Sequence, residues 1–172
     1  MAPHPHSADE DTALQDTFRM VMSTVCTPVS VVTAITDGRP HGTTVSAFTS
    51  LSMRPPMALV CLDRDSDLLT IVRTTGHFGL NVLGSDQSAL ALRFARKGPD
   101  KFAGVAWVPI DEVPAIVGVG GFLSCRVAQL VDGGDHVVVL GDVVAATTAH
   151  RSPLTYHGRA FGTHTPLEEA IA

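Results

Sequence analysis

Residues 42–56 read GTTVSAFTSLSMRPP, a run in which small hydroxyl side chains recur at every second position ahead of two prolines. The alternating positions are Thr44, Ser46, Phe48, Ser50 and Ser52. A period of two predicts a single β-strand over 42–53 with one face that is almost entirely hydroxyl, ended by Pro55 and Pro56. The face carries no charge, unlike an ordinary solvated strand face, so it favours a flat ligand with polar edges.

Strand-like runs continue on both sides of this stretch. The β-branched run over 29–36 ends at Asp37-Gly38, a dipeptide typical of a hairpin turn. Further strands are predicted at 57–62, 77–83, 121–131, 136–147 and 154–161, and helices at 11–25, 65–76 and 85–96. About seven strands with two or three helices at uneven spacing predict a mainly β fold, a barrel flanked by a few α-helices.

Two helix starts and one helix end have local sequence signals. We expect Asp65 or Ser66 to cap the helix at 65–76 and Gly76 to end it, because these residue types suit those positions. Ser85 is expected to cap the helix at 85–96 in the same way.

Length and charge narrow the possible classes of protein. The 172 residues suit one domain, predicted over 11–165, between a disordered arm at 1–10 and a tail at 166–172. The net charge of −5 and the nine aromatic residues disfavour nucleic acid as a partner. Three separate cysteines, no secretory signal and no long apolar run predict a cytoplasmic protein without a membrane partner.

Familiar catalytic motifs are missing from the sequence. The glycines in Gly118-Val119-Gly120-Gly121 precede a strand-like run, whereas a dinucleotide fingerprint needs a helix at that point. No zincin, serine-hydrolase or P-loop motif is present, and no paired Cys or His residues have metal-ligand spacing. We therefore expect no metal site.

Two other places carry residues suited to binding. Ser66 and Thr70 lie at the start of a predicted helix, where free amides and the helix dipole attract an anion such as phosphate, although Ser66 as a plain cap is equally expected. In Gly134-Asp135-His136, the glycine permits a tight turn that aims His136 away from the strand core, although a turn histidine is often incidental. The hydroxyl face itself suits an isoalloxazine ring, whose polar edge needs hydroxyl and amide partners.

Four motifs in order resemble the flavin reductase-like family, the short-chain NAD(P)H:flavin oxidoreductases of two-component monooxygenases. They are GTTVSAFTSLS with the two prolines, FGLNVL at 78–83, Arg93-Phe94-Ala95 leading to DKFAG at 100–104, and Gly134-Asp135-His136. The resemblance extends over residues 14–162. It implies an FMN-binding split β-barrel, Greek-key-like and antiparallel, which forms a homodimer with flavin near the subunit interface.

The resemblance also implies roles for individual residues. Those expected to contact the isoalloxazine and ribityl chain are Thr43, Thr44, Val45, Ser46, Ala47, Ser50 and Ser52. Ser66 and Thr70 would approach the phosphate, and Arg96 or Lys97 would offset the acids Asp63, Asp65 and Asp67. Further cofactor contacts are expected from Lys101, Phe102, Asp135 and Phe161. His136 is the catalytic candidate, beside the nicotinamide.

The implied activity is hydride transfer from NADH or NADPH to FMN or FAD, with reduced flavin passed to a separate monooxygenase. Such chemistry belongs to the cofactors, which agrees with a sequence lacking a nucleophile–base pair. Two alternatives stay open from the sequence: a non-catalytic flavin-binding protein, and a reductase that retains its flavin and acts on a small organic acceptor.

Overall fold

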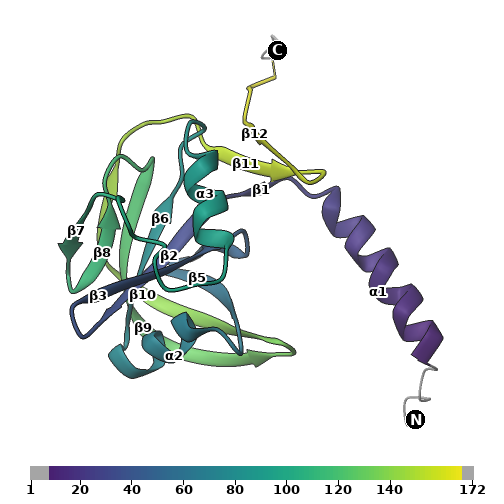
Figure 1. Cartoon of the computed structure of the whole chain (residues 1–172), viewed down its shortest axis with the longest axis horizontal. Coiled ribbons are helices and arrows are strands. Elements are labelled where there is room, and N and C mark those ends of the chain that lie inside the picture. The colour runs from purple at the N-terminus through teal and green to yellow at the C-terminus, as the bar shows by residue number, and fades with distance from the viewer. Residues whose placement is uncertain (1–7, 168–172) are drawn as a thin grey trace.

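The computed structural model describes residues 8–167 and is built mainly of antiparallel β-strands (Figure 1). The three helices of this part of the chain are α1 (Ala8–Ser23), α2 (Asp67–Thr75) and α3 (Ser88–Ala95). The strands are β1 (Thr27–Pro28), β2 (Ser30–Thr36), β3 (Arg39–Val45), β4 (Phe48–Met53), β5 (Pro56–Asp63), β6 (His77–Val82), β7 (Trp107–Ile110), β8 (Val113–Ile116), β9 (Gly121–Gly133), β10 (His136–Thr148), β11 (Leu154–His157) and β12 (Ala160–Thr163). The predicted mainly β class is therefore confirmed.

Seven of the strands form one curved sheet in the order β3-β2-β6-β9-β10-β5-β4. Its two edge strands, β3 and β4, follow each other in the sequence but pair with different neighbours, β2 and β5. Two smaller sheets, β1-β11-β12 and β7-β8, complete the fold. In the described part of the chain no ladder joins β3 to β4, so the barrel is split between these two edges.

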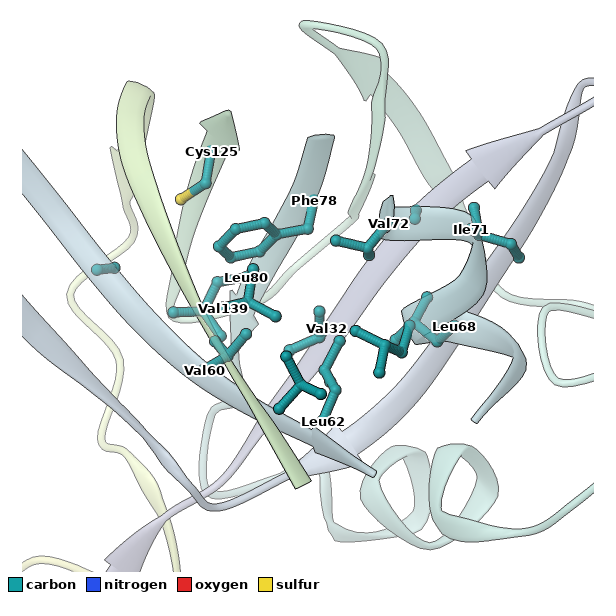
Figure 2. Close-up of a cluster of buried hydrophobic side chains, with 14 residues drawn as sticks. Val32, Val60, Leu62, Leu68, Ile71, Val72, Phe78, Leu80, Cys125 and Val139 are labelled. Atoms are coloured by element: carbon teal, nitrogen blue, oxygen red, sulfur yellow. The ribbon is translucent and has the colours of Figure 1, made fainter. Parts of the chain in front are cut away.

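The two faces of this sheet have separate apolar cores. One core packs α2 against the sheet, with Val32, Phe78 and Leu80 among the buried side chains that Figure 2 shows. A Cβ on Gly141 of β10 would lie 2.6 Å from the Phe78 ring, so the ring occupies the space that a larger residue there would need. The other core packs α3 and β8 against the opposite face, around Phe94 and Phe122 among others.

Most local signals are confirmed. Asp37 and Gly38 both have positive φ, 50° and 73°, in the hairpin between β2 and β3. The Ser66 hydroxyl accepts a hydrogen bond from the Leu69 amide, and Gly76 ends α2 with a φ of 72°. Ser66, not Asp65, is thus the cap of α2.

The cap predicted for α3 is wrong. Gln87, not Ser85, precedes this helix, and its side chain accepts a hydrogen bond from the Gly84 amide at 2.8 Å. The Ser85 amide donates instead to the Ser152 carbonyl, at 2.8 Å. Contacts between distant segments therefore decide where this helix begins.

Two predicted strands are each divided in the structure. The strand predicted over 42–53 breaks at Ser46 and Ala47, where the chain crosses from one sheet edge to the other, and β4 has an irregular register between Ser50 and Ser52. Its hydroxyls therefore do not share one continuous face. The strand predicted over 154–161 is the β11–β12 hairpin, and the β7–β8 hairpin was not predicted.

The first predicted helix is present as α1, but it projects away from the sheet (Figure 1). Its side chains Leu14, Phe18 and Val21 are 57–64% exposed. The helix begins at Ala8, inside the predicted arm, while residues 1–7 of that arm and 168–172 of the predicted tail lie outside the described residues. None of the described helices has the length and apolar character required to cross a membrane.

Candidate functional site

A surface cavity of about 420 Å³ lies between β3, the start of α2 and the loop after α3. The residues lining it are Pro40, His41, Gly42, Thr43, Asp63, Asp65, Ser66, Asp67, Leu68, Ala95, Arg96, Lys97, Gly98, Pro99, Lys101 and Phe102. Five predicted cofactor residues are among them: Thr43, Ser66, Arg96, Lys101 and Phe102. The structure thus brings the start of the hydroxyl-rich stretch, at Gly42 and Thr43, and the start of the predicted phosphate helix to one cavity.

The start of α2 forms one wall of the cavity. The Ser66 hydroxyl donates to the Asp63 carbonyl at 2.8 Å and accepts from the Leu69 amide at 3.2 Å, so both of its bonding directions serve the helix cap. The first amides of a helix have no partner within it and lie at the positive end of its dipole. At this wall an anion is therefore better held by the amides of Asp67 and Leu68 than by the Ser66 hydroxyl.

Charges of both signs surround the cavity. Asp63, Asp65 and Asp67 flank the cap, and Arg96 and Lys97 lie in the loop after α3. The Asp63 carboxylate accepts from the Asp65 amide at 2.8 Å, which ties it to its own loop. The two cations favour an anionic group in the cavity, and they oppose the repulsion that the carboxylates beside the α2 amides exert on it.

Lys101 holds two walls of the cavity together. Its ammonium donates to the carbonyls of Gly42 on β3 and Phe94 on α3, at 3.1 and 3.0 Å. Burial lowers the pKa of Lys101, and the charge of Asp67 acts in the opposite direction. Because the ammonium already donates to two carbonyls, its main role is to hold the cavity wall together and not to bind a ligand.

Gly42 allows these walls to approach closely. A Cβ at this position would lie 2.9 Å from the Phe94 ring and 3.3 Å from the Phe102 ring. The two rings meet edge to face with centroids 4.9 Å apart. A larger residue at 42 would push aside the aromatic pair that lies between the cavity and the second core.

The remaining predicted contacts on β3 and β4 lie outside this cavity. The Thr44 hydroxyl donates to the Ala91 carbonyl of α3 at 2.7 Å, and Val45 packs against the first core. Ser46, Ala47 and Ser50 are exposed where β3 passes into β4, so they are open to a ligand. Ser52 accepts a hydrogen bond from the Arg54 amide at 3.2 Å.

Thr70 and Phe161 also lie outside the cavity. Thr70 is exposed one turn into α2, and its carbonyl accepts from Thr74 at 2.9 Å. The Phe161 ring lies against the Tyr156 ring with centroids 5.3 Å apart and packs at the border of the second core.

The turn between β9 and β10 lies beside the cavity wall. His136 pairs with Asp63 across the β10–β5 ladder, and Gly134 has a φ of 68°. The His136 Nδ1 lies 2.8 Å from the Asp135 carboxylate, and this hydrogen bond holds the pKa of Asp135 below its usual range. Because an ionised carboxylate only accepts, Nδ1 carries the proton and Nε2 is left for a ligand.

Several cavity residues escaped the sequence reasoning, among them His41 and Pro99. His41 lies two residues before Thr43 on β3 and lines the cavity with it. Strand alternation places residues i and i+2 on one face, so this signal was available. Pro99 lies in an irregular loop, for which no comparable local signal exists.

Comparison with known proteins points to one family. The sequence profile of the flavin reductase like domain matches residues 22–165. The reductase component of 4-nitrophenol 4-monooxygenase/4-nitrocatechol 2-monooxygenase of Rhodococcus opacus is 40% identical over 154 residues, covering 90% of this chain and 83% of that protein. A flavin reductase (NADH) of Kitasatospora aureofaciens is 39% identical over 179 residues, covering 98% of this chain and 93% of that protein.

A solved structure is similar over nearly the same extent. It is the NADH:FAD oxidoreductase SgcE6 of Streptomyces globisporus C-1027 in complex with NAD and FAD fragments. Its TM-score is 0.84 at 31% identity, with coverage of 96% of this chain and 99% of that chain.

Replacing Lys101 tests its role in the cavity wall. Lys101→Met leaves two partly buried carbonyls without their charged donor, so the free energy of unfolding should fall by roughly 1.5–3 kcal/mol in urea titrations. Lys97→Met removes the same charge from the same cavity but breaks no hydrogen bond to the cavity wall. It should change the free energy of unfolding by about 0.5 kcal/mol or less. Equal losses in the two variants would show that Lys101 acts only through its charge.

Proposed function

The chain belongs to the flavin reductase like domain family and is an oxidoreductase, and we propose that it transfers hydride from NADH to FMN or FAD and supplies the reduced flavin to a separate monooxygenase. One observation carries this proposal most directly: Thr43, the amides at the start of α2 and the cation Arg96 meet at one cavity. The proposal also draws on the reductases of two-component monooxygenases that the chain resembles.

The donors around the cavity fit a flavin phosphate. The amides of Asp67 and Leu68 supply hydrogen-bond donors, and Arg96 with Lys97 supplies positive charge. From there the ribityl chain and ring would extend along Thr43 to the exposed Ser46 and Ala47, whose backbone amides and hydroxyl suit a polar ring edge. Bound flavin and nicotinamide supply the hydride chemistry themselves, and the protein's part is to bind and orient them.

His136 is proposed to orient the nicotinamide. Its Nδ1 proton is held by Asp135, so the ring is fixed on one side and presents Nε2 on the other. A hydrogen bond donated by the carboxamide N–H to Nε2 would align the nicotinamide ring without any proton transfer. Asp135 is then the residue that sets the orientation of the His136 ring.

A second copy of the chain is proposed to cover α1. Leu14, Phe18 and Val21 fall on one stripe of this helix, and all are more than half exposed in the single chain. An exposed apolar stripe on a helix that projects away from the sheet is typical of an interface. We propose a homodimer in which α1 packs on the partner.

Anaerobic stopped-flow spectroscopy tests the activity. Mixing the protein and oxidised FMN or FAD with NADH should bleach the visible absorbance of the flavin. NADPH in the same experiment measures the nucleotide preference. No bleaching with either nucleotide would favour a flavin-binding protein without catalysis. Flavin that never exchanges, together with reduction of a small organic acceptor, would favour an enzyme that retains its flavin.

His136→Ala tests the nicotinamide role. Loss of one orienting hydrogen bond should lower kcat/KM for NADH roughly tenfold, while the Kd for flavin stays within about twofold. His164→Ala, an exposed histidine after β12, serves as the control and should leave both unchanged. An unaltered reductive half-reaction in His136→Ala would remove His136 from the proposed site.

Sedimentation equilibrium of full-length variants tests the dimer. A charge in the apolar stripe should dissociate the dimer, so Phe18→Glu should sediment as a monomer at micromolar concentration. Met20→Glu, also apolar and exposed but about 200° away around α1, should remain dimeric. A monomeric wild-type protein at the same concentration would contradict the dimer.

A further inference from the structure

Arg64 joins the two ends of the proposed site. It lies between β5 and α2, and its hydrogen bonds and ion pair reach the end of β9 and the turn between β9 and β10. Its amide donates to the Asp135 carbonyl at 3.0 Å. Its Nε and Nη2 both donate to the Gly134 carbonyl, at 3.3 and 3.2 Å. Its Nη1 forms an ion pair with the Asp132 carboxylate at 3.0 Å.

The form of these contacts requires arginine. Two nitrogens of a planar guanidinium converge on one backbone carbonyl while the third reaches a carboxylate, which the single nitrogen of lysine cannot reproduce. The ion pair alone contributes little, because the Arg64 and Asp132 side chains are 41% and 76% exposed. The specific part of the arrangement is the fork on the Gly134 carbonyl.

Arg64 also belongs to the loop that shapes the start of α2. On one side of it, Asp63 accepts hydrogen bonds from the amides of Asp65 and Ser66 and from the Ser66 hydroxyl. Asp63 is in turn the ladder partner of His136. The loop that presents the proposed phosphate amides is therefore hydrogen-bonded, through Arg64, to the turn that carries His136.

The turn has few other restraints. Asp135 orients the His136 ring, but its side chain is 95% exposed. Because Asp135 belongs to the same turn, this contact does not attach the turn to the rest of the protein. Gly133 and Gly134 have no side chains with which to do so. The ladder ends here with His136 opposite Gly133, which leaves the guanidinium of Arg64 as the side chain that holds the tip of this turn.

We propose that Arg64 is a positioning residue, which fixes the Gly134-Asp135-His136 turn relative to the flavin-phosphate loop and thereby aligns His136 with the nicotinamide. This inference rests on the proposed function, since it assigns a purpose to the alignment of His136. It makes one loop responsible for both cofactors: its amides for the flavin phosphate, and its arginine for the turn at the nicotinamide.

Anaerobic stopped-flow kinetics on the full-length protein, with flavin bound and NADH varied, tests the role of Arg64. Arg64→Ala should lower the second-order rate constant of flavin reduction about five- to tenfold, with flavin Kd changed by no more than about twofold. Arg64→Lys should recover part of the rate, because it restores one donor. Arg73→Ala removes the same charge from the last turn of α2 and should have no effect.

The double variant Arg64→Ala/His136→Ala separates positioning from general damage. If Arg64 acts through His136, the double variant should reduce flavin no more slowly than His136→Ala alone, since the group to be aligned is already missing. Additive losses would overturn the inference, as would a change in flavin Kd in place of the change in rate.

Amide hydrogen exchange tests the restraint without relying on activity. Exchange at residues 134–136 should be faster in Arg64→Ala than in the wild type and in Arg73→Ala, because the tip of the turn opens more often. Unchanged exchange would overturn the inference even if the enzyme is active. Faster exchange in a protein that reduces no flavin would leave the restraint in place and refute the proposed function instead.

Discussion

The fold depends on the fact that two strands consecutive in the sequence occupy opposite edges of one sheet. β3 pairs with β2 and β4 pairs with β5, so the short link at Ser46 and Ala47 has to cross the split in the barrel. The Ala47 carbonyl is held there by the Cys61 amide at 2.9 Å, and Phe48 packs against the first core directly afterwards. The link is thus fixed by the pairing of Val45 with Ser30 on one side and by Ala47 and Phe48 on the other. Ser46 and Ala47 themselves are exposed, as a binding surface requires.

The same arrangement explains which parts of the fold were predictable from the sequence. Asp37-Gly38, Ser66 and Gly76 act through their own φ values or through amides within a few residues, so the sequence specifies their structure directly. The break at Ser46 has no such local cause. The alternation of hydroxyls continues through it, and only the pairing of the two halves with different strands reveals it.

The β7–β8 hairpin escaped prediction because a distant residue stabilises it. Buried Asn81 on β6 accepts from the Ile116 amide at 2.7 Å and donates to the Val31 carbonyl at 3.1 Å, which joins the hairpin to the sheet. Thr33 adds a hydrogen bond to the Pro114 carbonyl at 2.6 Å. A polar residue in an apolar strand indicates that such partners exist but not where they lie. The candidate site residues could be chosen from the sequence because short motifs identify them, and recognising a motif requires no knowledge of its contacts.

The activity proposed for this cavity depends mainly on how the protein positions the two cofactors. The described cavity holds no nucleophile paired with a base, and its strongest interactions are directed at its own walls: Ser66 at its helix, Lys101 at Gly42 and Phe94, and Asp63 at the loop before α2. Cofactors that carry their own reactivity need distance and angle from the protein more than acid or base. A requirement for exact distances and angles predicts charged side chains that hydrogen-bond to backbone groups and so hold chain segments in place.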